Sequence, residues 1–319
     1  VILPVGISFY TFQTMSYSLD IYFKKLKPTR DFISFASFVS FFPQLVAGPI
    51  VRASHLLPQL LSKRVFKYDQ GVQGLRLILW GLFKKVVIAD SLAWRVNYSF
   101  ENYHTLDGGT LLLGLIYFSI QIYCDFSGYS DIAIGTAKLF GINIRTNFNF
   151  PYFSRDIGQF WRRWHISLSS WFRDYLYIPL GGSKRSQWTS IRNIFIIFIV
   201  SGFWHGANWT FIVWGLTHAL LYIPLFLIGK NRKYTTNVVA ENNWFPSIKE
   251  LFQIGMTYFS TTIAWVFFRS ENISSSFKYL NSMILKFSIP LDNRGGITYI
   301  LLLICFDLFL LKNNNEMLE

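Results

Sequence analysis

Charged residues are scarce in this sequence. Asp, Glu, Lys and Arg together make up 15% of the 319 residues, while hydrophobic residues make up 52% and aromatic residues 19%. A soluble domain carries about a quarter charged residues, so this chain has too little polar surface to cover a water-soluble core. The composition predicts a protein whose main solvent is lipid.

Cysteine and metal-ligand patterns are almost as scarce. The two cysteines, Cys124 and Cys305, lie far apart in apolar surroundings and give neither a disulfide framework nor the spacing of a metal site. The sequence also has no internal repeat, no low-complexity tract and no phosphate-loop glycine pattern. We therefore expect no metal and no bound cofactor.

The chain starts without an initiator methionine or a basic leader. Val1 lies inside an apolar run, and the polar end at residues 312–319 directly follows another one. This start is not a signal peptide. We expect one transmembrane domain over residues 1–319. It is expected to be a fragment that lacks N-terminal spans, and the lack of C-terminal spans is left open.

The charge that is present has one dominant sign. The formal net charge is +13, and the Lys and Arg residues fall between apolar segments, at 24–30, 63–67, 162–192 and 230–233. Loops that follow the positive-inside rule have this distribution, as do segments that bind anionic lipid headgroups. A nucleic-acid-binding module would gather the charge in a patch on a soluble domain. We therefore expect membrane lipid as a partner and no nucleic acid, with attraction of an anionic acyl donor as a second use of the charge.

Eight apolar segments predict an all-α, multi-pass transmembrane fold. They are residues 1–23, 32–46, 72–89, 110–126, 191–204, 209–228, 252–268 and 297–311. The second runs into Pro43 and then Gly48-Pro49, which predicts a re-entrant helix, and the fifth breaks at His205-Gly206 and resumes at once. Unwound backbone at membrane depth survives only against protein or a water-filled cavity, so we expect the functional site at these breaks.

Residues 160–177, FWRRWHISLSSWFRDYLY, have a different pattern. At about 100° per residue the aromatic and leucine side chains share one broad face, and arginines and serines lie opposite. A Trp-rich apolar face and a basic polar face predict an amphipathic helix lying in the membrane interface. His165 falls at the edge of the apolar face, directed toward protein or membrane.

His205, in SGFWHGANWTF, is the strongest candidate for chemistry. An ionisable side chain at membrane depth is costly and indicates function, and neutral imidazole can accept a proton at physiological pH. On a helix Asn208 would share its face, as a hydrogen-bond partner. The alternative is a structural histidine bonded to a neighbouring carbonyl.

The remaining polar candidates have simpler explanations. His55 and His104 are expected in solvated loops, and His218 is expected to bond a neighbouring helix. Asp125 and Asp131, in YCDFSGYSD, either orient a histidine, pair with an arginine, or cap a helix that starts after Gly128.

Several strings together resemble the membrane-bound O-acyltransferase (MBOAT) family, in particular its AlgI-like branch of alginate and polysaccharide O-acetyltransferases. The strings are PVGISFYTFQTMSYSLDIY (4–22), FFPQLVAGPIVR (41–52), YCDFSGYSDIAIGTAKLFGI (123–142), NFNFPYFSRDIGQFWRRWHISLSSWFRDYLYIPLGG (147–182) and SGFWHGANWTFIVWG (201–215). Further along, IAWVFFRS (263–270) is a recognisable trace.

The resemblance implies a ring of transmembrane helices around a central tunnel. His205 of the WHG motif would be the catalytic residue and general base, and His165 of the RWH motif the second histidine, nearer the cytoplasmic side. Trp204 and Asp125 are counted with the tunnel, and Asn208 is expected from its spacing to stabilise an oxyanion. Arg162 and Arg163 would receive an anionic donor or anchor headgroups.

The implied reaction moves an acyl group, acetyl in this branch, from a cytoplasmic thioester, acetyl-CoA or an acyl-carrier protein, to a hydroxyl. The enzyme would lie in the bacterial inner membrane and hand the acetyl group to a periplasmic or other extracytoplasmic partner protein, for O-acetylation of an extracellular polysaccharide such as alginate or peptidoglycan. Two rivals remain: a transporter or channel, which broken helices also suit, and a non-catalytic acyl conduit with the same fold. Both histidines lining one tunnel would favour acyl transfer.

Overall fold

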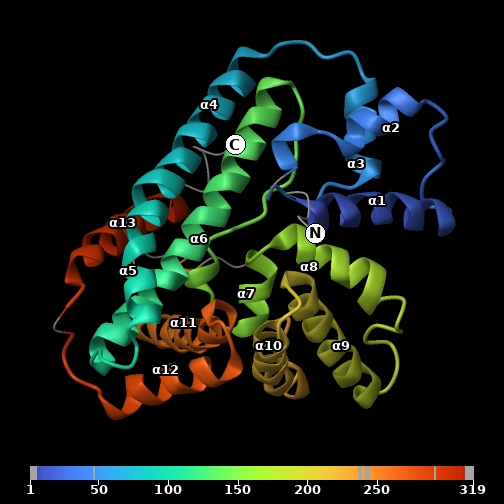
Figure 1. The fold of residues 1–319 in the computed structure, drawn as a ribbon. Helices are drawn as coiled ribbons and strands as arrows, with labels where there is room; N and C mark the ends of the chain where they lie inside the picture. Colours follow the sequence, from blue (N-terminus) through green and yellow to red (C-terminus); the bar gives the residue numbers. More distant parts are fainter. Residues whose placement is uncertain (1–5, 46, 236–238, 241–244, 291, 313–319) are drawn as a thin grey trace.

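The computed structural model describes residues 6–45, 47–235, 239–240, 245–290 and 292–312, and within them all regular structure is helical (Figure 1). The helices are α1 (Ile7–Tyr22), α2 (Phe32–Val39), α3 (Ala53–Leu61), α4 (Tyr68–Leu82), α5 (Asp90–Glu101), α6 (Gly108–Leu139), α7 (Ile157–Arg163), α8 (Ile166–Phe172), α9 (Gln187–His205), α10 (Trp209–Leu227), α11 (Ile248–Arg269), α12 (Ile273–Leu285) and α13 (Ile297–Lys312). The all-α prediction is confirmed.

Four of the described helical segments are long and apolar enough to cross a membrane. They are Gly108–Leu139, Trp209–Leu227, Ile248–Arg269 and Arg294–Leu311. The expected segment 32–46 forms the short helix α2 and a 3₁₀ turn, Phe42–Gln44, and its last residue lies outside the described residues, as do residues 1–5 of the first segment. The segment 191–204 lies in α9, and α10 begins after a short break, as expected.

α6 is the central helix, and glycines bring α4 against it along much of its length (Figure 1). A Cβ atom added at Gly74 would lie 2.7 Å from the carbonyl oxygen of Gly135, and one added at Gly81 would lie 2.5 Å from that of Gly128. Small residues allow this close backbone approach between membrane helices. Gly128 therefore serves helix packing inside a continuous α6, and the predicted helix start after it is wrong.

A π-helical turn, Phe83–Ala89, continues α4 and places two successive lysines against α6. Lys84 Nζ lies 2.6 Å from Asp131 Oδ2 and donates to Ser127 Oγ at 2.9 Å, with only 4% of its side chain exposed. Lys85 Nζ lies 2.6 Å from Asp125 Oδ1. Buried charges of this kind are tolerated when they are paired and hydrogen-bonded. The two aspartates thus pair with lysines, and the predicted pairing with a histidine or arginine is wrong.

The single amphipathic helix expected over residues 160–177 is instead broken. α7 ends at Arg163, α8 begins at Ile166, and a π-helical turn, Arg173–Tyr177, follows. His165 sits in the left-handed region with φ 46°. The next two backbone N–H groups bond Asn147, at its carbonyl oxygen (2.9 Å) and at Oδ1 (3.1 Å). Both hydrogen bonds use backbone N–H groups at the start of α8 as donors. They fix the non-helical conformation of the chain between α7 and α8.

The aromatic face of the same segment is covered by protein. Phe160, Trp164 and Trp171 are 1%, 4% and 6% exposed. Trp171 stacks on Phe12 of α1 with ring centroids 4.1 Å apart. The face that predicted an interfacial helix therefore packs into the core around the site.

Glycine also allows close packing of α9 against α10. The predicted break at His205 lies between these two helices. A Cβ atom added at Gly202 would lie 2.3 Å from the carbonyl oxygen of Phe211. Gly255, by contrast, is an exposed position of α11 where an added Cβ meets nothing within 4 Å. We expect Gly202→Ala to lower the free energy of unfolding by about 1–3 kcal/mol, the usual effect of overpacking.

The measurement is the thermal unfolding midpoint of the detergent-solubilised full-length protein. Gly255→Ala is the matched control and should leave the midpoint unchanged or raise it, because alanine favours a helix over glycine. Equal midpoints for the two variants would contradict the close α9–α10 contact.

Candidate active site

A cavity of about 500 Å³ lies where the two predicted breaks meet. Its lining comes from α1, the turn before Gly48, the π-helical turn after α4, α6, the α7–α8 junction and helices α9, α10 and α11. The lining residues are Ser8, Phe9, Ala47, Lys85, Ile122, Asp125, Phe126, Tyr129, Trp164, His165, Trp204, His205, Trp214, Trp265 and Phe268. Both predicted histidines, with Trp204 and Asp125, therefore line one cavity.

His205 is the last residue of α9 and reaches the cavity half-buried. Aromatic rings surround it: the centroids of Trp204, Phe268 and Trp214 lie 4.9, 5.0 and 5.1 Å from its own. Its ring makes no hydrogen bond with any residue that the structure describes. The imidazole is thus held in place by packing, and its nitrogens are left for a ligand. The alternative of a structural histidine bonded to a carbonyl finds no support here.

His165 is fixed by hydrogen bonding. Asn147 Oδ1 accepts from the backbone N–H of Ser167 (3.1 Å) and from its hydroxyl (2.9 Å), and His165 Nδ1 lies 3.2 Å from the same oxygen. Because this oxygen is an acceptor, Nδ1 must carry the proton. In the neutral ring Nε2 then holds a lone pair, and it has no hydrogen-bond partner among the described residues.

Trp204 and Phe9 connect the two histidines. The centroid of the Trp204 ring lies 4.9 Å from that of His205 and 6.0 Å from that of His165. The Phe9 ring contacts both Trp204 and His165, with centroid distances of 5.6 and 6.3 Å. The histidines therefore belong to one aromatic wall. A ligand that lies along this wall can meet both.

The charged pair Lys85–Asp125 is the polar part of the cavity lining. The two side chains are 42% and 51% exposed, and Lys85 also bonds Asp90 at 2.8 Å. Asp125 orients neither histidine. The pair offers both signs of charge at the more open part of the cavity.

Three predicted site residues do not line the cavity. Asn208 caps α10 by accepting from Thr210 N–H (3.1 Å) and donates to the carbonyl of Glu271 (2.8 Å). Arg162 donates to the carbonyls of Asn231 (2.9 Å) and Tyr234 (3.1 Å), where it holds the connector after α10. Arg163 is buried in α7.

The other histidines lie elsewhere. His55 lies in α3, so its predicted place in a loop is wrong, and its Nε2 bonds the carbonyl of Asn143 at 2.9 Å. His104 is exposed beside Tyr103. His218 is fully buried among aromatic rings, and neither ring nitrogen has a hydrogen-bond partner among the described residues. The predicted bond from His218 to a neighbouring helix is wrong.

Sequence reasoning missed part of the aromatic lining. Trp214 lies in the second turn of α10, and Trp265 and Phe268 come from α11. Trp214 and Trp265 stack with ring centroids 5.7 Å apart. The string IAWVFFRS at 263–270 carried the signal for the last two.

Comparison with known proteins decides the family. Residues 24–235 match the MBOAT, membrane-bound O-acyltransferase family. The chain belongs to this family. The matched region includes both histidines and Trp204, so the cavity is the cavity of an MBOAT protein, and the sequence-based assignment is confirmed. An MBOAT chain with several apolar helices is a multi-pass membrane protein.

Three relatives of this MBOAT chain show the range of related functions. It is 40% identical to the probable alginate O-acetylase AlgI of Pseudomonas aeruginosa over 283 residues (89% of this chain, 52% of the relative). It is 38% identical to the peptidoglycan O-acetyltransferase of Helicobacter pylori (89% and 57%), and 30% identical to the teichoic acid D-alanyltransferase of Bacillus subtilis (76% and 62%). The chain spans between about half and two thirds of the length of these relatives.

Proposed function

We propose that this chain carries the acyl-transfer site of an enzyme that moves an acetyl group from a thioester to a hydroxyl. The observation that carries the proposal is the sharing of one cavity by His165 and His205 in a chain of the MBOAT family. A transporter can also hold histidines at membrane depth, so the family match is what favours acyl transfer over transport. The proposal is also supported by two relatives near 40% identity that are named O-acetylating enzymes.

His205 is the general base in this proposal. A ring nitrogen of His205 takes the proton of the acceptor hydroxyl as the oxygen forms a bond to the thioester carbonyl carbon. The tetrahedral oxyanion then collapses, the carbon–sulfur bond breaks, and the imidazolium returns the proton to the departing sulfur. General-base catalysis of this kind contributes about 10² to 10⁴ in rate.

His165 has a positioning role in the proposal. Its Nε2 lone pair can accept a hydrogen bond from an amide N–H of the donor, and its Nδ1–H is committed to Asn147. The wall between the histidines is aromatic, and a polar contact is stronger beside such an apolar surface than in bulk water. His165 thus orients the thioester toward His205.

The donor, acceptor and location follow from the same proposal. The donor is acetyl-CoA or an acetylated carrier protein on the cytoplasmic side of a bacterial inner membrane. The acetyl group reaches an extracellular polysaccharide, such as alginate or peptidoglycan, directly or through an extracytoplasmic partner protein. The names of the relatives support an acceptor outside the cytoplasm, since they specify alginate, peptidoglycan and teichoic acid.

Complementation of a deletion strain tests the function and names the acceptor. We expect the full-length gene to restore ester-linked acetate to one polymer, measured after mild alkaline release from separately purified exopolysaccharide and peptidoglycan. The empty vector is the control. Unchanged acetate in every polymer, with and without the gene, would contradict O-acetylation as the function.

A further inference from the structure

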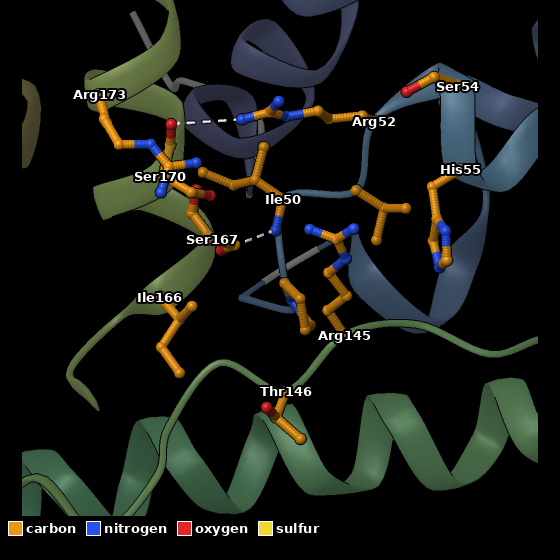
Figure 2. Close-up of a pocket in the computed structure, with 12 residues that line it drawn as sticks. Ile50, Arg52, Ser54, His55, Arg145, Thr146, Ile166, Ser167, Ser170 and Arg173 are labelled. Carbon is orange, nitrogen blue, oxygen red and sulfur yellow. Dashed lines mark hydrogen bonds between the residues drawn. The ribbon is translucent and has the colours of Figure 1, made fainter. Parts of the chain in front are cut away.

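A second cavity, of about 270 Å³, lies beside the site and is lined by three arginines. Its residues come from the segment before α3 and the first turn of α3, the chain between α6 and α7, and helix α8 with the turn that follows it (Figure 2). They are Pro49, Ile50, Val51, Arg52, Ser54, His55, Arg145, Thr146, Ile166, Ser167, Ser170 and Arg173. The lining includes no Asp or Glu.

The positive charge in this arginine pocket is only partly compensated. Arg52 lies 2.5 Å from Asp174 Oδ2, and Arg173 Nε lies 2.7 Å from Asp174 Oδ1. Burial raises the pKa of Asp174, but the hydrogen bonds from Arg173 and Arg52 outweigh it and hold that pKa below its ordinary value, so Asp174 is ionised at neutral pH. Arg145 has neither a hydrogen-bond nor an ion-pair partner within the described part of the chain. One carboxylate thus pairs with two of the three guanidinium groups.

A hydrogen-bonded partition joins this pocket to the cavity of the two histidines. The Ile50 N–H donates to Ser167 Oγ at 3.0 Å (Figure 2). That hydroxyl donates to Asn147 Oδ1, the oxygen that also holds His165. Ile50 and Ser167 line the arginine pocket, while Ala47 and His165 line the other cavity. The same two short segments, residues 47–50 and 165–167, therefore contribute to the lining of both spaces.

The chemistry of the pocket suits a phosphate group. Guanidinium groups bind phosphate oxygens by paired, charge-assisted hydrogen bonds. The volume lies below the ~300–1,000 Å³ of pockets that enclose a whole drug-sized ligand, so it fits a phosphate and its nearest substituents. α3 begins at the rim without a side-chain cap, and its free N–H groups add partial positive charge.

We propose that the arginine pocket binds the phosphate at the end of the pantetheine arm of the acyl donor. This inference rests on the proposed function, which places a thioester at His165. Acetyl-CoA and an acetylated carrier protein share this phosphate, so the pocket serves either donor. For its thioester end to reach the two histidines, the arm must pass the segments that carry Ile50 and Ser167, which separate the two spaces.

Binding to the full-length protein in phosphatidylcholine nanodiscs tests the pocket. The probes are 4′-phosphopantetheine and pantetheine, which differ only by the phosphate. We expect the wild-type protein to bind the phosphorylated probe at least about tenfold more tightly, and Arg145→Gln to remove most of that difference, in line with the strength of a charged hydrogen bond. Arg145→Lys should keep part of it. Arg76→Gln, an equal loss of charge on the exposed side of α4, is the matched control and should bind like wild type.

Turnover separates this inference from the proposed function. In the donor assay Arg145→Gln should raise KM about tenfold and leave kcat unchanged, with acetyl-CoA and acetylated carrier protein compared to identify the natural donor. Unaltered phosphopantetheine binding by Arg145→Gln, in a protein that transfers acetyl groups, would overturn the pocket and leave the function standing. Tight phosphopantetheine binding without transfer to any hydroxyl would overturn the function instead.

An anionic lipid headgroup is the alternative occupant. If the wild-type protein bound both probes equally, and Arg145→Gln weakened only the retention of phosphatidylglycerol in mixed nanodiscs, the pocket would be a lipid site. That result would overturn the inference.

Discussion

His205→Ala should lower the rate of acetyl transfer by about 10² to 10⁴-fold, the contribution of a general base. Its ring makes no hydrogen bond with the described residues and is held by aromatic packing, so the variant loses a proton acceptor without breaking a polar network. The measurement is the initial rate of transfer of labelled acetyl from the thioester, using full-length protein at matched amounts in membranes.

Two controls make this result specific. His104→Ala removes an exposed histidine outside the cavity and should keep the wild-type rate. His205→Gln fills much of the same space but cannot take up a proton at neutral pH, so it should be as slow as His205→Ala. Wild-type rates in both His205 variants would sink the general-base assignment and favour an acyl conduit.

Asn147→Ala should lower the free energy of unfolding by about 3 kcal/mol or more, since each buried donor left without a partner costs about 1–3 kcal/mol. Asn147 is 1% exposed, and its Oδ1 accepts from His165 and twice from Ser167. Without this acceptor the α7–α8 break loses its side-chain anchor and keeps only the bond to the Asn147 carbonyl, and His165 loses the contact that fixes its tautomer. Transfer should therefore fall in the fraction of protein that still folds.

The matched comparison for Asn147 lies two residues away. Asn149 is exposed, and its side chain makes no hydrogen bond with the described residues, so Asn149→Ala should unfold at the wild-type midpoint. Asn147→Asp keeps an acceptor oxygen in place and should recover part of the loss. Equal unfolding midpoints for Asn147→Ala and Asn149→Ala would show that the Asn147 hydrogen bonds do not hold the junction.

The helices and the main site residues could be predicted because they depend on local signals. The lengths of the apolar segments predict membrane-spanning helices, and the glycine-flanked break at His205 predicts where α9 ends. Ala47 and His205, next to the two predicted breaks, both line the cavity, whereas His165 reaches it from the α7–α8 junction.

The α7–α8 junction could not be predicted from periodicity. The helical pattern continues through His165, and what breaks it is a set of hydrogen bonds to Asn147, which lies outside the helical pattern, 18 to 20 residues before the groups that it bonds through Oδ1. Tertiary contacts of this kind override helix propensity. The same limit explains the lysine partners of Asp125 and Asp131, because a π-helical turn at Phe83–Ala89 changes which side chains face α6.

Asn208 shows a more local limit. Its spacing from His205 would place the two on one face only if the helix continued, but α9 ends at His205 and Asn208 becomes the N-cap of α10. Asparagine is a preferred residue at that position. Its amide is then committed to Thr210 and to the carbonyl of Glu271, and the oxyanion role stays a prediction.

The most direct test of the central claim is an experimental structure of the full-length protein with a non-cleavable acetyl thioester analogue bound. We predict the acyl carbon in the cavity lined by His165 and His205, with a His205 ring nitrogen within hydrogen-bond reach of the space from which a hydroxyl attacks, about 3–3.5 Å from the reacting atoms. An analogue held outside this cavity, with both histidines still packed against aromatic rings alone, would contradict the proposed acyl-transfer site.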